Sequence, residues 1–514
     1  MFFRMKSIRV AVIGLLFCIP LSCFAQQERS TVTGIAGKYA AMINPGTIRP
    51  LLEVLASPQM EGRETATRGQ AKAASFIITQ LQQAGVQPGA AGGWEQFYEM
   101  YEDTLIKGEI RIRDKEYHFG EDFITDLLES RSESIHTNQI TFAGYGISTA
   151  SFNDYANLDV RGKVVLIREG VPGGLPRDYG ITYNKLAAAR AAGVRALLVI
   201  SPHARNYRLL NRNKLRHTGI YMPGASAAEG PNLYYITPAM AADLLGKAYN
   251  DSLLDTQKGH LRMPVHVSVP VQITLDKKSN VYKPSNILGI VEGSDKKDEY
   301  VFVTAHYDHL GVQDSVLYPG ADDDGSGTSA VMAIAAAFAK ARQEGHGPRR
   351  SMVFMLVSGE EKGLLGSGYY INHPIYPLTQ TVVDLNIDMI GRIDPAHERD
   401  TNYIYIIGDD KLSSELRPIN EMANGITRFK LDYKYNDPGD PEDFYRRSDH
   451  YKFAEQNIPV IFYFNGTHAD YHQPGDTVEK IEFALLARRA QLVYYTAWEM
   501  ANREERLKVD RPEK

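Results

Sequence analysis

The spacing of apolar residues changes along the chain and separates regions of different predicted structure. Residues 48–55 and 70–84 carry apolar residues at helical spacing. Beyond residue 285, short apolar runs of strand length alternate with helix-forming stretches. The predicted strands are residues 286–291, 300–304, 352–357, 382–387, 403–407 and 459–464, and the predicted helices are residues 329–342 and 483–501. This alternation predicts an α/β fold, a mixed, mostly parallel sheet with helices on both faces.

The middle of the chain has a different pattern. Residues 140–145, 162–167 and 195–200 have the length and composition of strands, and residues 183–192 form an alanine-rich stretch typical of a helix. We therefore expect a smaller, mainly-β domain inserted over residues 131–270. The main domain would then consist of residues 26–130 and 271–514.

The first 25 residues differ from both regions. Three basic residues stand within the first nine positions, and residues 10–19 are apolar but too few to span a membrane. Small residues up to Ala25 fit a cleavage site, so a signal peptide is predicted over residues 1–25. We accordingly expect an exported protein, either periplasmic or secreted.

The two cysteines of the chain, Cys18 and Cys23, both lie in this segment. After cleavage behind Ala25, the mature protein would have no disulfide and no thiolate metal ligand. Lipid attachment at Cys23 is the alternative, and it would anchor the protein to a membrane. Pro20 counts against lipid attachment, because leucine is the usual residue at that position.

Composition and charge narrow the class of protein. Hydrophobic residues make up 43% and charged residues 23%, which is typical of a globular protein. The net charge of −5 gives no basic excess, and we expect no nucleic-acid partner. No second long apolar run follows the N-terminal one, so no membrane span is predicted. The sequence gives no indication of the oligomeric state.

Acidic residues and histidines follow four of the predicted strands, 300–304, 352–357, 382–387 and 459–464, and also occupy the loop that leads into the predicted helix at 329–342. In open α/β sheets, ligands gather at the carboxyl ends of strands. Imidazole and carboxylate groups without a thiolate suit zinc or a similar divalent ion, and a carboxylate has two oxygens with which to bridge two ions. These residues are His306 and Asp308, the three aspartates at 322–324, Glu360 and Glu361, Asp388, and His468 and His472.

Two of these motifs place like charges side by side. Glu360 and Glu361 repel each other unless a cation or a proton intervenes, and the same holds for the aspartates at 322–324. A calcium loop is the main rival interpretation of the triple aspartate. The spacing and the terminal glutamate of an EF-hand are absent, which favours the zinc interpretation.

Taken together, these motifs closely resemble the zinc aminopeptidase family with a co-catalytic metal pair. Its relatives include glutamate carboxypeptidases, glutaminyl cyclases and the transferrin receptor ectodomain. The insert is similar, more weakly, to a protease-associated domain, and residues 55–69 look like the lead-in segment of exported members. The matching stretches of the main domain are residues 285–289, 305–311, 320–327, 360–367, 386–391, 448–450 and 470–477.

The resemblance implies a ligand for every position of a metal pair, two Zn²⁺ or similar divalent ions. His306 and Asp388 would bind the first ion, Glu361 and His472 the second, and Asp323 would bridge them. No matched position is missing, which counts against an inactive relative.

The resemblance also implies three residues that act beside the metals. Glu360 would be the general base that activates a metal-bridging water. Asp308 would orient His306 through its other ring nitrogen. Tyr471 would donate a hydrogen bond to the developing oxyanion, or else only pack against His472.

Several neighbouring residues have no ligand role in the family pattern. His309, His450 and His468 are expected to be structural. Asp322 and Asp324 are expected to support the bridge or the start of the following helix.

The function implied by the resemblance is an exported di-zinc aminopeptidase that removes N-terminal residues from peptide substrates. A carboxypeptidase, a dipeptidase or a glutaminyl cyclase on the same site is an alternative. A cyclase of this family uses one zinc, and a carboxypeptidase needs a cation for the substrate carboxylate, which no motif singles out. A non-catalytic binding protein on the same fold is the alternative from a different class.

Overall fold

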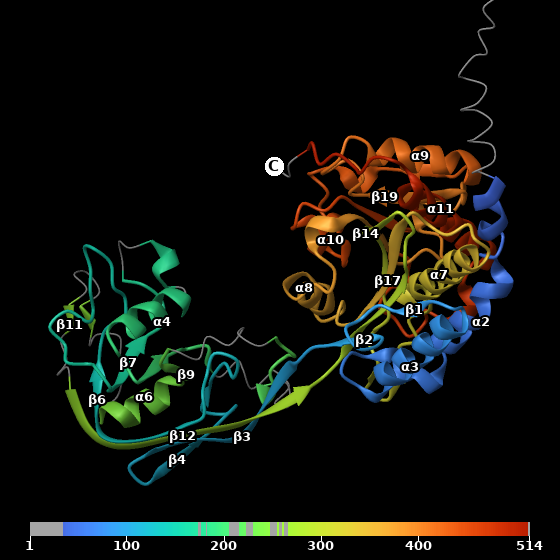
Figure 1. The fold of residues 1–514 in the computed structure, drawn as a ribbon. Helices are drawn as coiled ribbons and strands as arrows, with labels where there is room; N and C mark the ends of the chain where they lie inside the picture. The colour runs from blue at the N-terminus through green and yellow to red at the C-terminus, as the bar shows by residue number, and fades with distance from the viewer. Residues whose placement is uncertain are drawn as a thin grey trace, which may run out of the picture. The chain divides into compact units, whose positions relative to one another are not determined.

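The structure, a computed structural model, describes residues 34–172, 176–180, 182–204, 215–222, 230–246, 254–255, 260–261 and 266–511. The chain divides into two compact units (Figure 1). One unit comprises Met1–Tyr98 and Pro284–Lys514, and the other comprises Glu99–Lys283. The predicted signal peptide and both cysteines lie outside the described residues.

The larger unit is built on a mixed sheet, as predicted. Its strands run in the order β1-β13-β17-β14-β18-β21-β19-β20, with β2 also paired to β13. The middle strands from β17 to β21 are parallel, whereas β13 and β19 pair antiparallel on either side of them. The bounds are β1 Gln87–Pro88, β2 Glu95–Phe97, β13 Ser285–Val291, β14 Lys296–His306, β17 Arg350–Val357, β18 Thr381–Ile387, β19 Tyr403–Ile407, β20 Lys430–Asp432 and β21 Val460–Phe464.

The central strands are apolar on both faces, because both faces are covered. Every residue of β17 is buried, and the side chains of β14 alternate between two cores. Val301 and Val303 pack into the larger core, whereas Phe302 faces the other one. A continuous apolar run is the pattern expected of a strand buried on both sides.

Helices form the two outer layers of this unit (Figure 1). The larger core includes residues of α2, α3, α7, α9 and α11, and the smaller core on the opposite face includes residues of α8 and α10. The predicted helices at 48–55, 70–84, 329–342 and 483–501 are confirmed with small shifts at their ends. The bounds are α2 Pro45–Leu55, α3 Arg68–Gln83, α7 Gly327–Gln343, α8 Leu365–Asn372, α9 Leu416–Thr427, α10 His450–Ala454 and α11 Phe483–Asn502.

The smaller unit contains an eight-stranded sheet in the order β4-β3-β12-β6-β7-β8-β9-β5. Strands β6 to β9 are parallel, and α6 packs against the buried side chains of β12. The bounds are β3 Met100–Ile112, β4 Lys115–His118, β5 Phe123–Ile124, β6 Glu133–Phe142, β7 Val164–Arg168, β8 Ala196–Ile200, β9 Asn232–Ile236, β12 His266–Tyr282, α4 Thr182–Ala191 and α6 Pro238–Leu245.

The boundaries of this smaller unit lie outside those expected for the insert. The sequence predicted residues 131–270, whereas the compact unit extends over Glu99–Lys283. The reason is the pairing of β3 with β12, whose register runs from Ile112 opposite Val271 to Met100 opposite Tyr282. The similarity of this unit to a protease-associated domain stays a prediction.

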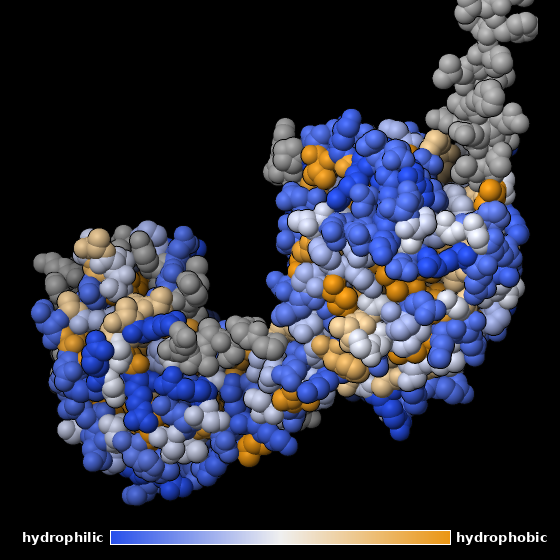
Figure 2. Space-filling model, viewed as in Figure 1, coloured by the Kyte–Doolittle hydropathy of each residue, from blue (hydrophilic) through white to orange (hydrophobic). Residues whose placement is uncertain are grey.

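Surface character agrees with the composition. On the face drawn in Figure 2, hydrophilic residues cover most of the surface and apolar residues occur in small separate groups. Within the described part of the chain, none of the helices is both long and apolar enough to cross a bilayer.

The buried Asp384 in β18 makes stability depend on pH. Burial raises the pKa of this carboxyl well above its usual range, against the hydrogen bond from Thr304, and its Oδ2 has no hydrogen-bond partner. The folded chain therefore keeps a proton that the unfolded chain loses near pH 3.9, so stability falls as pH rises from there toward the folded-state pKa.

We predict that Asp384→Asn removes this dependence, because an amide stays neutral at every pH. The free energy of unfolding of the variant relative to the wild type should therefore rise between pH 5 and pH 8, by about 1.4 kcal/mol for each pH unit over which the folded carboxyl keeps the proton that the unfolded one has lost. Denaturant unfolding of both proteins at pH 5 and pH 8 measures the difference. A variant that is equally destabilised at both pH values would contradict it.

Candidate metal centre

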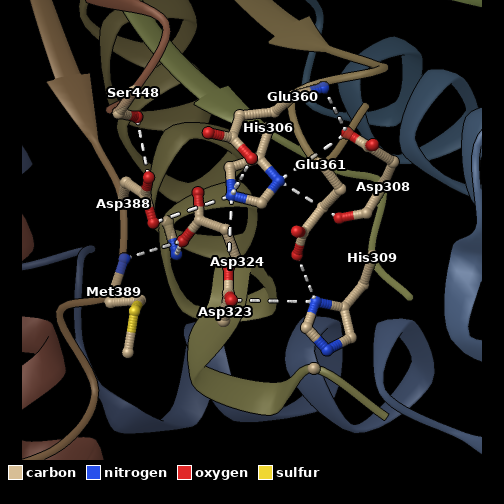
Figure 3. Close-up of polar contacts among 12 residues, drawn as sticks. His306, Asp308, His309, Asp323, Asp324, Glu360, Glu361, Asp388, Met389 and Ser448 are labelled. Atoms are coloured by element: carbon tan, nitrogen blue, oxygen red, sulfur yellow. Dashed lines mark hydrogen bonds and ion pairs between the residues drawn. The ribbon is translucent and has the colours of Figure 1, made fainter. Parts of the chain in front are cut away.

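Four strands and the loops that follow them bring the predicted site residues to one edge of the sheet (Figure 3). His306 ends β14, Asp388 follows β18, and Glu360 and Glu361 follow β17. Because β17, β14 and β18 are adjacent and parallel, their carboxyl ends open at the same place. The remaining residues come from the loop before α7 and the loop after β21.

A first group of ligand atoms surrounds the ring of His306. Its Nε2 lies 3.3 Å from Oδ1 of Asp323 and 3.6 Å from Oδ1 of Asp388. His306 is 1% exposed, and its Nε2 has no hydrogen-bond partner. An imidazole nitrogen that faces two carboxylates without a hydrogen bond is the arrangement expected of a metal ligand.

A second group lies on the other side of Asp323. Its Oδ2 is 3.1 Å from Nε2 of His472, and the same nitrogen is 3.2 Å from Oε2 of Glu361. The two oxygens of one carboxylate thus face two different sets of ligands. The residues present therefore fit two divalent ions, with Asp323 between them.

Glu360 and Tyr471 line a cavity beside these ligands. The cavity is lined by Asp323, Glu360, Asp388, Met389, Phe444, Arg447, Phe462, Phe464, Tyr471 and His472. Oε2 of Glu360 is 4.0 Å from Nε2 of His306. The Tyr471 hydroxyl accepts a hydrogen bond of 3.3 Å from Arg447, and its ring stacks on His472 at a centroid distance of 4.0 Å.

The contact of Asp308 with His306 differs from the expected one. Nδ1 of His306 is 3.1 Å from the main-chain oxygen of Asp308, whereas the nearer carboxylate oxygen is 3.7 Å away. The carboxylate instead accepts hydrogen bonds from the hydroxyl of Thr65 at 2.6 Å and from the backbone N–H of Glu360 at 3.3 Å. Asp308 therefore contacts His306 through its carbonyl and fixes the backbone of Glu360 through its carboxylate.

The neighbouring aspartates support the loop that carries Asp323. Asp324 accepts hydrogen bonds from the backbone of Gly327, at the start of α7, and from Met389. Asp322 accepts one from Gly391 and lies 3.2 Å from Nε2 of His468. These contacts agree with a supporting role for the two aspartates and for His468.

Three residues at this site were not identified from the sequence as taking part. Arg63 is fully buried and donates to the carbonyls of Leu55, Tyr307, Pro319 and Gly320. Thr65 donates to Asp308, and His309 places Nδ1 2.9 Å from Oε1 of Glu361. His309 stands three positions after His306 at the same strand end, which was the one available signal for it.

Comparison with known proteins identifies the family to which the metal-centre segment belongs. The profile of peptidase family M28 matches residues 286–497, which include every proposed metal ligand. This segment belongs to peptidase family M28. The chain is 26% identical over 399 residues to aminopeptidase YwaD of Bacillus subtilis, covering 74% of this chain and 72% of that protein.

Other similar proteins match different shares of the chain. A probable zinc metalloprotease of Leptosphaeria maculans is 28% identical over 279 residues, 47% of this chain and 62% of that protein. The chain spans 51–62% of the length of this protein and its counterparts from Pyrenophora tritici-repentis and Pyricularia oryzae. The solved aminopeptidase from Aneurinibacillus sp. strain AM-1 aligns with 93% of this chain and 100% of its own at 18% identity and a TM-score of 0.49.

The electrostatics of the M28 site follow from the crowding of acidic groups. Burial raises the pKa of Glu360 well above its usual range; His306 opposes this shift, and the charges of Glu361 and Asp388 add to it. Burial lowers the pKa of His472, but its contacts with Asp323 and Glu361 raise it to about 10. His472 therefore holds a proton at neutral pH when no metal is bound.

We predict that zinc uptake by the M28 site releases protons. His472 must lose its proton to bind a metal, so the apparent affinity should rise with pH toward the pKa of about 10. Calorimetric titration at pH 7 in buffers of different ionisation enthalpy measures the release. A heat of binding that is the same in all buffers would contradict this prediction.

Proposed function

We propose that this protein is an exported aminopeptidase that uses two divalent ions, zinc by preference, to hydrolyse the first peptide bond of its substrates. The observation that carries the proposal is the position of Asp323, whose two oxygens lie 3.3 Å from His306 and 3.1 Å from His472. Membership of the M28 family and the similarity to aminopeptidase YwaD support it. Export rests on the N-terminal 25 residues.

In this proposal, His306 and Asp388 would hold one ion, Glu361 and His472 would hold the other, and Asp323 would be shared by both. Two ions bound there would polarise the scissile carbonyl and lower the pKa of a bridging water from about 15.7 toward about 7.

Glu360 is proposed to move the proton. Its raised pKa, caused mainly by burial, makes it a better proton acceptor than an exposed glutamate. It takes the proton from the attacking water and delivers it to the leaving amine. The hydrogen bond from its backbone N–H to Asp308 keeps it beside the ligands.

Tyr471 is proposed to stabilise the oxyanion. Burial raises the pKa of its hydroxyl, and the charges of Asp323 and Asp388 raise it further, so the phenol stays protonated. A protonated hydroxyl in the same cavity is able to donate to the carbonyl oxygen as negative charge develops on it.

Arg447 supports the alternative of a carboxypeptidase or a dipeptidase. Among the residues that line the cavity, it is the one Lys or Arg, and its Nη2 lies 3.3 Å from the Tyr471 hydroxyl. A guanidinium at this place has the fork geometry that binds a carboxylate. It would suit the C-terminal carboxylate of a dipeptide as well as a peptide carbonyl.

We predict that Glu360→Gln lowers kcat by about 100- to 10,000-fold, the range for loss of a general base. The amide cannot accept the proton, but the five ligands are unchanged, so the zinc content should stay that of the wild type. Turnover of a peptide and metal analysis of the same preparation test both points. Full activity in this variant would rule out the proposed mechanism.

We also predict which ends of a peptide must be free. An aminopeptidase cleaves a peptide with a C-terminal amide as well as the unmodified one, and leaves the N-acetylated twin intact. Mass spectrometry of the three peptide incubations over time shows which peptides are cleaved and in what order their residues are lost. A chelator should stop the cleavage.

The Arg447→Met variant distinguishes the alternatives in the same assay. Arg446→Met is the matched control, because Arg446 is exposed and pairs with Asp443. If the amide blocks cleavage and only Arg447→Met abolishes activity on the free acid, the carboxypeptidase or dipeptidase alternative replaces our proposal. Cleavage of none of the three peptides with zinc added would favour the non-catalytic binding protein.

A further inference from the structure

His309 points into the second group of ligand atoms, although the family pattern gives it no role. Figure 3 shows its ring facing Glu361 and Asp323. Nδ1 lies 2.9 Å from Oε1 of Glu361 and 3.8 Å from Oδ2 of Asp323. The side chain of His309 is fully buried, whereas that of His472 is 38% exposed.

The separations fit ligands of one ion. With metal–ligand bonds of about 2.0–2.1 Å in a tetrahedron, two ligand atoms lie about 3.3 Å apart. The two contacts of His309, at 2.9 and 3.8 Å, bracket that value, and those of His472, at 3.1 and 3.2 Å, lie close to it. One ligand atom each of His309, Asp323 and Glu361 lie within 4.8 Å of one another. His472 contacts the same two carboxylates, through Oδ2 of Asp323 and Oε2 of Glu361.

The backbone fixes the His309 ring in this place. The backbone N–H of His309 donates to the carbonyl of Arg63. Arg63 is fully buried, and its guanidinium donates to four backbone carbonyls. A Cβ at Gly320 would lie 2.5 Å from two ring carbons of His309, and Gly320 has a φ of +57°. A glycine at 320 thus leaves the space that the ring occupies.

From this geometry we propose that His309 binds the second metal ion through Nδ1, as a ligand in addition to Asp323, Glu361 and His472. The inference rests on the proposed function, because it needs an ion at that position. The neutral imidazole offers its Nδ1 lone pair and carries its proton on Nε2. The second position then has four protein ligands and the first has three, so the second ion should be held more tightly.

The competing role is that of a positioning residue. In that case, Nδ1 carries the proton and only donates a hydrogen bond to Glu361. Nε2 of His309 is buried without a hydrogen-bond partner. The surroundings of Nε2 therefore do not distinguish the ligand role from the positioning role. The two roles differ in the number of imidazoles bound to metal.

Proton NMR of the Co²⁺-loaded wild-type protein counts these imidazoles. Each bound ring gives one strongly shifted, solvent-exchangeable N–H signal. We expect three signals, from His306, His472 and His309, at two equivalents of cobalt. Two signals at two equivalents would overturn the role of His309 and leave the metal pair of the proposed function intact.

Two variants test the same point through affinity. His309→Asn keeps a donor near the position of Nδ1, and His309→Phe removes it. A ligand role predicts that both variants lose one N–H signal and bind the second ion more than about 100-fold more weakly, beyond the roughly 10- to 100-fold typical of a residue that only supports a ligand. Wild-type affinity in His309→Asn with loss in His309→Phe would show the positioning role instead.

His397→Asn is the matched control, because His397 is also buried and pairs with a carboxylate, Asp394, that is not part of the site. It should keep all three signals.

The number of cobalt ions bound per chain separates this inference from the proposed function. Uptake of one equivalent, with a signal that disappears in His309→Asn, would support His309 as a ligand while refuting the pair.

Discussion

Mutual repulsion of buried carboxylates is the constraint on which the M28 site depends. Asp323, Asp324 and Glu360 are buried together at the end of the sheet, with Glu361 and Asp388 beside them. Burial of several like charges is costly unless cations or protons compensate them. Two divalent ions are the compensation that the ligand geometry fits best, and their chemistry is the function that we propose.

Protein groups provide the rest of the compensation. Arg63 is fully buried, and burial lowers its pKa, while the charges of Asp323 and Asp308 favour its charged form. Its five-donor guanidinium also ties the residues after β14 to the loop before α7, through the carbonyls of Tyr307 and Gly320. One side chain thus offsets negative charge and fixes the two segments that carry His306 and Asp323.

The sequence predicted much of this site because strand ends are visible in it. The apolar run 352–357 ends at Ser358, which marks the end of a buried strand. Glu360 and Glu361 follow directly, so the sequence alone predicts that they lie at the edge of the sheet. The family resemblance then assigned each candidate ligand to one of the two metal positions. The contacts of Arg63 with Tyr307 and of Thr65 with Asp308 could not be read in the same way, because each joins residues more than 240 positions apart. The orientation of His309 and the carbonyl contact of Asp308 depend on loop conformation, which apolar spacing does not report.

The fold was predictable for similar reasons, except at the insert. β3 and β12 are long, and much of each is polar or half exposed, so neither stands out as an apolar run. Their pairing with each other moved both boundaries outward, to Glu99 and Lys283. Long-range pairing of this kind is a tertiary feature that local patterns do not specify.

Anomalous diffraction from crystals grown with zinc tests the central claim most directly. Our account predicts two zinc peaks roughly 3.5–4 Å apart, one on each side of the Asp323 carboxylate, as in two-metal sites generally. A single peak, or two peaks that do not share Asp323, would contradict it.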